Sequence, residues 1–337
     1  MSRTALLRGA IGIAISVVAI WILVRSVDIG KAAEVLRTAS PAWIALMVVT
    51  AVVDVSARGA RWQALLAPIV PLPFRRVLGY TFMGYLANNV LPARLGELYR
   101  SHALGEGEGV SRTTVLGTVV VERVVDTVMV VAIAAVAVLI LSARGTISNA
   151  VLLGLAFVAL LAIALGLGIV GHRLPGASRV TAVIGRWPRV LELARRLRKG
   201  LAVAGHPRTL VAALAFSALA WAASTGTFLA AGQAVGVQLT VAQAALLTSG
   251  VALVTIVPSG PGYLGTVELT VVGIAGGFGV SAEAALPLGL LAHLLIIVVT
   301  SLGGVAALLA FRGRQERAEE VRRTAAGPGS DWPPRAR

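Results

Sequence analysis

Charged side chains follow an interrupted apolar run in the first third of the chain. The apolar residues 80–87 lead to Pro92, and Arg94, Glu97 and Arg100 come next. An arginine guanidinium binds phosphate through a planar fork of donors, and a neighbouring glutamate orients that arginine or accepts from an amine or hydroxyl. The run is too short to cross a bilayer, which takes about 20 apolar residues. We therefore interpret this stretch as a binding site for a lipid headgroup, with a hinge at the membrane interface as the alternative. Its candidate residues are Asn89, Pro92, Arg94, Gly96, Glu97 and Arg100.

A second stretch has the same skeleton, with an apolar run, then a proline and, four positions later, a glycine. Pro258 lies 258 − 92 = 166 positions after Pro92, about half the chain length. Paired hydrophobic segments that are interrupted by Gly or Pro indicate a transporter site built from inverted repeats. The candidate residues of this stretch are Pro258, Pro261, Gly262 and Glu268.

A predicted helix over about 113–141 carries three charged residues in an otherwise apolar run, namely Glu122, Arg123 and Asp126. Glu122 and Asp126 share a helix face, and Arg123 and Asp126 are spaced to pair. A charged residue inside a membrane is by default a hypothesis for a functional site. These residues form either the opposite wall of the same cavity, a proton relay, or an ion network that fixes helix packing. Removal of Arg123 is expected to leave Asp126 unpaired.

Two further polar groups occur in apolar surroundings. His293 lies in a predicted helix over about 284–311; it is a candidate site residue, although such a histidine is more often packed and hydrogen-bonded. Asp54, Arg58 and Arg61 come at the predicted end of a helix over about 42–57. Long side chains at a helix end extend to the membrane surface, so these three are not expected in the site.

The sequence offers little for catalysis. It has no cysteine, no metal-ligand cluster and no spacing of a nucleophile and a base, so no cofactor or metal is expected. Residues 260–265 match G-x-G-x-x-G, but a dinucleotide site needs a strand before the glycines, and this segment is apolar. No P-loop for ATP is present. An enzymatic role depends only on the acid pair Glu97 and Glu122.

The composition defines the class of protein. The chain is 57% hydrophobic and 13% charged, whereas soluble domains are about 25% charged. The net charge of +15 resides largely between apolar runs, as in cytoplasmic loops, and does not indicate nucleic-acid binding. We predict an all-α polytopic membrane protein with two re-entrant broken hairpins, a short amphipathic helix within 25–40, and about six spanning helices. The expected spans are about 6–24, 42–57, 113–141, 149–170, 210–231 and 284–311.

The distribution of basic residues predicts the topology. Region 172–208 has nine Lys or Arg and one acid, so it is expected in the cytoplasm together with both termini. The halves, about 41–141 and 210–311, then have opposite orientations, with one hairpin entering from each side. They belong to a transmembrane domain over 1–311, and the tail 312–337 is expected to be a disordered cytoplasmic segment.

The motifs resemble the transmembrane region of lysylphosphatidylglycerol synthases, a flippase-like family, over about residues 5–311. They are Asn89-x-x-Pro92-x-Arg94-x-Gly96-Glu97-x-x-Arg100, Ser111, Glu122-Arg123-x-x-Asp126, and Pro258-x-x-Pro261-Gly262-x-x-Gly265-x-x-Glu268. The resemblance implies a helical domain that moves lipids between leaflets. A soluble aminoacyl-transfer domain follows it in the full-length synthases, whereas 26 residues follow here, so lysine transfer is not expected.

The functional prediction is a lipid translocase in the cell (inner or plasma) membrane that moves an anionic phospholipid or a lipid-linked sugar. Its partners are membrane lipids bound by the phosphate headgroup, with a glycosyltransferase or a second copy of the chain as further candidates. Two alternatives remain open. One is an integral-membrane enzyme acting on lipid-linked substrates, and the other is a scaffold for a glycosyltransferase.

Overall fold

The computed structural model describes residues 3–91, 95–141, 196, 199–256 and 259–326 of the 337-residue chain. Every regular element in these ranges is helical, as predicted. The expected span 149–170, most of the basic region 172–208 and the last part of the tail lie outside the described residues.

The chain begins with a bent pair of helices. α1 (Arg3–Ser26) and α2 (Ile29–Arg37) meet at an angle of 90°. Asp28 caps α2 by accepting a hydrogen bond from the backbone N–H of Lys31 at 3.1 Å. The short amphipathic helix predicted within 25–40 is therefore present.

Two antiparallel helices form the centre of the molecule, α3 (Pro41–Leu66) and α10 (Pro207–Ala234). The start of α3 meets the end of α10, because the N–H of Ser40 donates to the carbonyl of Ala234 at 2.9 Å. The hydroxyls of Thr50 and Thr227 lie 2.8 Å apart further along. α3 continues past the predicted end near residue 57, and this extension carries Arg58 and Arg61 into the protein interior.

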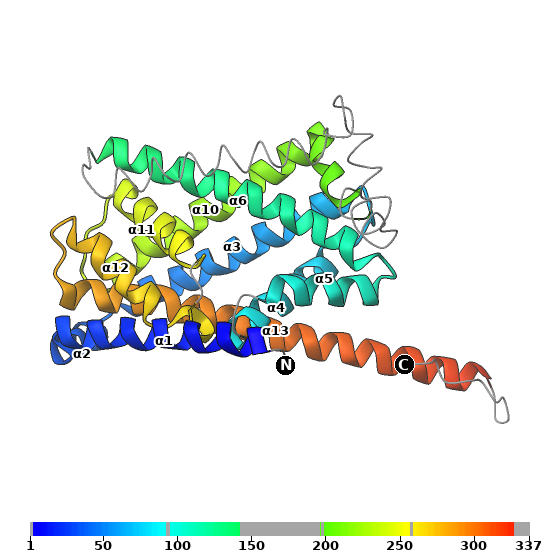
Figure 1. Cartoon of the computed structure of the whole chain (residues 1–337), viewed down its shortest axis with the longest axis horizontal. Helices are drawn as coiled ribbons and strands as arrows, with labels where there is room; N and C mark the ends of the chain where they lie inside the picture. Colours follow the sequence, from blue (N-terminus) through cyan, green and yellow to red (C-terminus); the bar gives the residue numbers. More distant parts are fainter. Residues whose placement is uncertain (1–2, 92–94, 142–195, 197–198, 257–258, 327–337) are drawn as a thin grey trace.

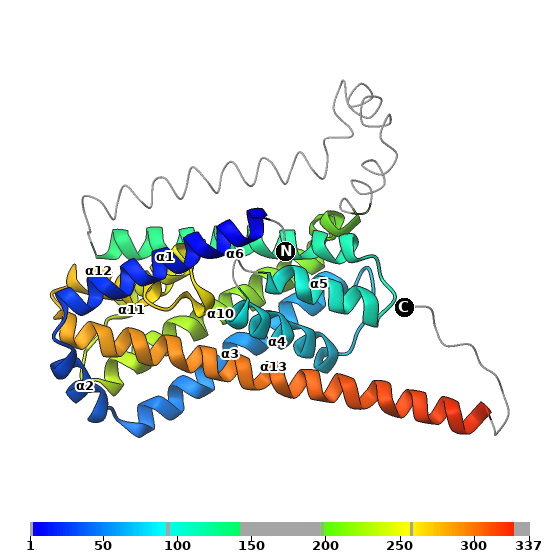
Figure 2. The same ribbon diagram turned by 60° about the horizontal axis from the view of Figure 1, so that its bottom comes forward.

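Two long helices flank the α3–α10 pair, α6 (Arg112–Ile140) and α13 (Ala282–Ala326) (Figures 1 and 2). α13 continues beyond residue 311, so residues 312–326 of the expected disordered tail are helical. Arg, Gln, Glu and Ala, which favour helices, dominate this segment, and Gly327-Pro328 follows it. The prediction overlooked this local propensity because the segment has no apolar periodicity.

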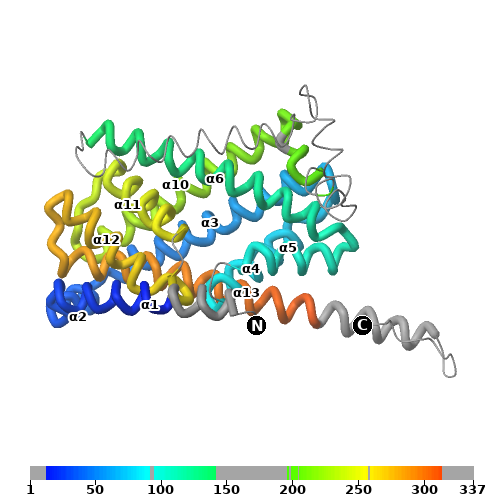
Figure 3. Tube along the Cα trace, in the orientation of Figure 1, coloured from blue at the N-terminus to red at the C-terminus, as the bar shows by residue number. Residues whose placement is uncertain are grey.

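Both interrupted segments are pairs of packed short helices, whose course Figure 3 traces. The first pair is α4 (Phe74–Val90) and α5 (Gly96–Gly107). The second is α11 (Val241–Val254) and α12 (Thr266–Gly276), with the 3-10 turn η4 (Pro261–Tyr263) between them. The longest of these helices, α4, has 17 residues and is about 25 Å long at 1.5 Å per residue, which is less than the roughly 30 Å of a hydrocarbon core.

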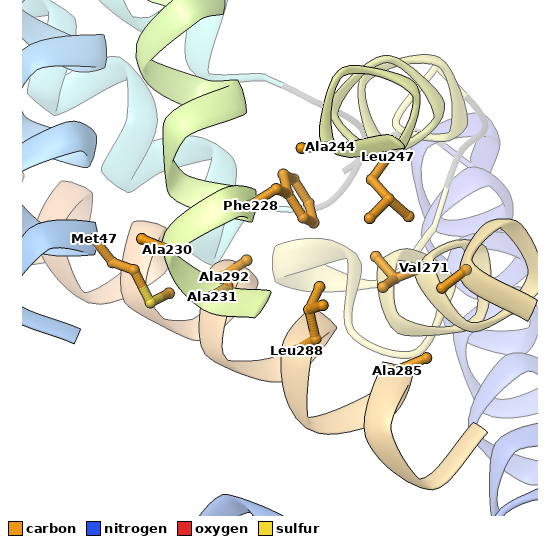
Figure 4. Packing of buried hydrophobic residues seen from close by; sticks show 11 residues of the cluster. Met47, Phe228, Ala230, Ala231, Ala244, Leu247, Val271, Ala285, Leu288 and Ala292 are labelled. Carbon is orange, nitrogen blue, oxygen red and sulfur yellow. The ribbon is translucent and has the colours of Figure 1, made fainter. Parts of the chain in front are cut away.

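Each hairpin packs against helices from both halves of the chain. α4 packs on α13 and α11 packs on α6, while α5 packs on α6 and α12 packs on α13. One cluster of the core shows the consequence (Figure 4): Met47 of α3, Phe228 of α10, Leu247 of α11, Val271 of α12 and Leu288 of α13 are buried together. Alanines fill much of the rest of this cluster, and small residues let membrane helices approach closely.

Four helices in the described part of the chain are long and apolar enough to cross a membrane, or five if the bent α1–α2 pair is one span. The remaining predicted span, 149–170, is outside this part. Apolar side chains point outward on several helices: Val17 is 59% exposed, Leu139 77% and Leu302 67%. Such apolar surfaces are unfavourable in water and favourable in contact with lipid.

Candidate functional site

A cavity of about 360 Å³ lies where the two hairpins meet. Asn88 and Asn89, at the end of α4, and Gly96, at the start of α5, line it from the first interruption. Gly262 and Tyr263 of η4 line it from the second interruption. The two stretches with the repeated Pro and Gly spacing therefore contribute to one site.

Most of the predicted site residues line this cavity, but not all of them. Pro92, Arg94 and Pro258 lie outside the described residues. Pro261 opens η4 and does not line the cavity, and Glu268 is buried behind the lining residue His293. The predicted residues that line the cavity are Asn89, Gly96, Glu97, Arg100, Glu122, Arg123, Asp126, Gly262 and His293.

Glu122 of α6 is the centre of a cluster of charged side chains. Its Oε1 accepts hydrogen bonds from Arg100 Nη2 at 2.9 Å and Arg123 Nη2 at 2.8 Å, and it forms an ion pair with Arg61 Nη2 at 3.0 Å. The Arg100 guanidinium also stacks over the ring of Trp62, 4.4 Å from its centroid. Residues on α3, α5 and α6 thus meet at a single carboxylate.

Asp126, one helical turn further along α6, has a second set of arginine partners. Arg61 donates from Nη1 to Oδ1 and from Nη2 to Oδ2, the latter at 3.1 Å. Arg123 Nη2 lies 2.9 Å from Oδ2, so the predicted pairing of Arg123 with Asp126 is confirmed. Arg58 approaches Oδ1 to 3.7 Å.

The expectation that Asp54, Arg58 and Arg61 extend to the membrane surface is wrong. Arg61 is fully buried, and the other two form an ion pair at 2.8 Å with side chains that are only 11% exposed. Arg58 also lies over the ring of Trp221, 4.7 Å from its centroid. The reason is the length of α3, which continues to Leu66. The spacing i, i+4, i+7 places all three residues on one helix face and was the signal that could have found them.

The charges of this cluster cancel among the described residues. Four arginines (Arg58, Arg61, Arg100 and Arg123) face four carboxylates (Asp54, Glu97, Glu122 and Asp126). Buried charges are tolerated only when they are paired in this way. The network therefore fixes the packing of α3, α5 and α6 and at the same time forms a wall of the cavity.

Two members of the cluster are the most accessible. The Arg123 side chain is 38% exposed and that of Glu97 is 26% exposed, with Nη1 and Oε1 3.4 Å apart. The other members have side chains that are at most 11% exposed. A ligand in the cavity therefore meets one cation and one anion side by side.

Gly96 is required by close packing at the first interruption. A Cβ on this residue would collide with the carbonyl of Gly84 and would lie 2.7 Å from Asn88 Cγ. Its N–H donates to Asn88 Oδ1 at 2.8 Å. Close packing, and not a left-handed backbone, is the reason for glycine here, because Gly96 has no positive φ, whereas Gly262 has φ +65°.

Polar side chains anchor both interruptions. Asn89 donates from Nδ2 to Thr300 Oγ1 at 2.9 Å and to Ser301 Oγ at 3.0 Å, both on α13. In the second hairpin the N–H of Gly260 donates to Ser16 Oγ of α1 at 2.9 Å. These bonds pair a side-chain amide and a backbone N–H close to the two helix interruptions, where a membrane offers no water as a partner.

His293 and Glu268 form a second buried pair at the cavity. The distance from His293 Nδ1 to Glu268 Oε1 is 2.7 Å, and Glu268 Oε2 accepts from the N–H of Gly265 at 2.7 Å. His293 is thus hydrogen-bonded, as expected of a histidine packed among helices, and it also lines the cavity. Within the described ranges, no group of three His, Asp or Glu side chains is suited to hold a metal ion.

Comparison with known proteins identifies a family. The family model for the lysylphosphatidylglycerol synthase TM region matches residues 9–304, a range that includes every side chain of the cavity. None of the curated proteins compared with the chain matches it.

Proposed function

The chain belongs to the family of the lysylphosphatidylglycerol synthase TM region, and from this premise we propose that it moves a lipid between the leaflets of a membrane. The polar headgroup would pass through the cavity between the hairpins while the acyl chains stay in the bilayer. The headgroup would be that of an anionic phospholipid or a lipid-linked sugar, with its phosphate on Arg123 and a hydroxyl or amine on Glu97.

The observation that carries this proposal is the shared cavity. Irregular backbone at membrane depth is tolerated only where it is buried in protein or lines a cavity. Both interruptions line the same cavity, and one wall of it carries charged side chains. A buried charged wall bounded by lipid-facing helices is suited to hold a headgroup in a membrane.

We also propose that residues 41–141 and 210–311 are inverted repeats. If α3, α4, α5 and α6 correspond to α10, α11, α12 and α13, the extensive packing contacts within this set have counterparts: α4 on α13 corresponds to α11 on α6, and α3 on α4 corresponds to α10 on α11. Pro41 and Pro207 open the two central helices at 207 − 41 = 166 positions apart, which equals the separation of Pro92 and Pro258. The antiparallel course of α3 and α10 supports opposite orientations.

Such a pair of repeats offers two related arrangements around one central site, the basis of alternating access. The charged side chains are distributed unequally between the repeats. The cluster of four arginines and four carboxylates lies on α3, α5 and α6, whereas α10 and α11 contribute no charged residue to the cavity. The first half would hold the headgroup, and movement of the second hairpin would expose it to one side or the other.

The enzymatic alternative has less support. It needs Glu97 and Glu122 as an acid and a base, but Glu122 Oε1 is occupied by three guanidinium groups. The scaffold alternative depends on the basic region 172–208, which lies mostly outside the described residues. The proposed location is the cell membrane, with both termini in the cytoplasm.

Reconstitution in liposomes tests the proposal. Vesicles with purified protein and fluorescent phospholipids are treated with an impermeant quencher, and lipids are then extracted and analysed. Transbilayer movement without chemical change supports a translocase. A modified lipid supports an enzyme. The absence of both movement and modification supports a scaffold. Arg112→Ala, which alters an exposed pair with Glu106, is the matched control for substitutions in the cavity.

A further inference from the structure

The buried pair of His293 and Glu268 has no part in headgroup binding as proposed above. Glu268 is 2% exposed and His293 is 8% exposed. Both oxygens of Glu268 are occupied, one by His293 Nδ1 and one by the N–H of Gly265. The pair therefore holds a fixed geometry at the edge of the cavity.

The surroundings of Glu268 determine which nitrogen of His293 carries the proton. Glu268 lies in the first turn of α12, and its Oε2 accepts from the backbone N–H of Gly265, as a carboxylate does at the N-terminus of a helix. An ionised carboxylate only accepts hydrogen bonds, so Nδ1 must donate to it. Nε2 is then the ring nitrogen with a free lone pair. A proton added there gives an imidazolium that remains paired with Glu268.

Protonation at this position changes the charge of the cavity by +1. Around it, the described charged side chains cancel: Asp54 and Arg58 on α3, with Arg61 behind them, Glu97 and Arg100 on α5, and Glu122, Arg123 and Asp126 on α6. Tyr85 of α4 and Tyr263 of η4 also line the cavity and are neutral at physiological pH. The described side chains of α1, which packs on α12, carry one charge, Arg25 in the last turn, and α13 has Glu283 in its first turn.

We infer that His293 is a proton-binding site that is coupled to the binding of an anionic headgroup in the cavity, with Glu268 as its positioning residue. This inference rests on the proposed lipid translocation. An anion is attracted to the protonated cavity, and by linkage the bound anion increases proton occupancy to the same degree. Lipid and proton would then cross together. A proton gradient would give transport a direction, which a lipid site alone does not provide.

Binding measurements on the purified full chain test the coupling. The probe is short-chain phosphatidylglycerol, with zwitterionic short-chain phosphatidylcholine for comparison, from about pH 8 to about pH 5, the range in which an unperturbed histidine changes charge. The affinity for the anionic probe should increase as the pH falls, by a factor between about 5 and 150, which is typical of coupled sites. In weakly buffered solution its binding should take up protons. No increase and no uptake would overturn the inference.

Two substitutions assign the effect to His293. His293→Gln should abolish both the pH dependence and the proton uptake. The matched control His206→Gln, at an exposed residue before α10, should retain both. Retention of the normal pH dependence by His293→Gln would overturn the inference.

Glu268→Gln provides a second test, which remains informative if His293→Gln folds poorly. The amide oxygen can still accept from Gly265, and the amide NH₂ would donate to His293 Nδ1. The ring proton then moves to Nε2, and the pH dependence should shift to lower pH. A purely structural role for Glu268 predicts no such shift, so an unchanged pH profile in a folded Glu268→Gln protein would contradict the inference.

Vesicle measurements separate this inference from the proposed function. Proton-linked binding without transbilayer movement would remove the translocase proposal and leave the proton site in place. Transbilayer movement with the same rate at every pH, and no proton uptake, would remove the proton site and leave the translocase in place. A pH gradient, acidic either inside or outside the vesicle, is expected to accelerate lipid movement by the normal protein. The same gradient should not accelerate movement by His293→Gln.

Discussion

Arg61 of α3 donates from two nitrogens to both oxygens of Asp126, which lies 65 residues later on α6. The same guanidinium reaches Glu122 at 3.0 Å. Arg61 is completely buried, and a buried charge is stable only when it is paired and hydrogen-bonded. This arginine is therefore the main link between the central helix and the charged wall of the cavity.

Arg61→Met should destabilise the protein by about 3–5 kcal/mol, because the substitution leaves two buried carboxylates with fewer partners. The free energy of unfolding of purified protein in detergent measures the effect. Arg112→Met, which removes an exposed arginine paired with Glu106, should leave it nearly unchanged. Equal effects of the two substitutions would show that Arg61 has no special structural role.

Arg123→Ala should reduce lipid movement by about tenfold or more, the effect of losing one charge-assisted hydrogen bond of about 1.5 kcal/mol. The fold should be retained, because Arg61 still binds Asp126 and Glu122. The rate in vesicles and the unfolding free energy are measured together. Arg123→Lys, which keeps the charge but loses the planar fork, should have an intermediate rate. Normal movement by Arg123→Ala would exclude this residue from the site.

Gly96→Ala should destabilise the first hairpin by about 1–3 kcal/mol, the usual cost of overpacking, because a Cβ would collide with Gly84 and Asn88. Thermal unfolding in detergent gives the comparison. Gly273→Ala is the control, since that position in α12 has open space around it and alanine favours a helix by about 0.5–1 kcal/mol over glycine. The close approach of α4 and α5 would be in doubt if both variants were equally stable.

Single cysteines test the topology directly, because the chain has none of its own. Ser148→Cys, in the predicted outer loop 142–148 with Arg144 as its one basic residue, should react with an impermeant thiol reagent from outside the cell. Ser178→Cys, in the basic region 172–208, and Thr324→Cys should react only after permeabilisation. Cytoplasmic labelling of Ser148→Cys would contradict the inverted arrangement of the two halves.

The interruptions of the helices could be predicted from sequence because their causes are local. Proline lacks the donor that a helix interior needs, and apolar runs of limited length are visible in the sequence. The first break falls between Val90 and Gly96 and the second between Val254 and Thr266. Both lie where the repeated Pro and Gly spacing placed them.

The partners of the buried charges could not be predicted, because they come from distant parts of the chain. Arg61 was assigned to the membrane surface since α3 was expected to end near residue 57, and hydropathy alone does not reveal a buried partner on α6. The expectation that Asp126 depends on Arg123 alone was wrong for the same reason. Its loss does not leave Asp126 unpaired, because Arg61 binds that carboxylate more completely.

The bonds from Asn89 to Thr300 and Ser301 have a consequence for biosynthesis. The first hairpin is synthesised some two hundred residues before the segment of α13 on which it packs. The Asn89 amide therefore lacks these partners, and is hydrogen-bonded to water, lipid headgroups or a chaperone, until α13 has entered the membrane. Assembly of the cavity is in this way delayed until α13 has been synthesised, and a chain that stops before α13 lacks the hydroxyl partners of Asn89.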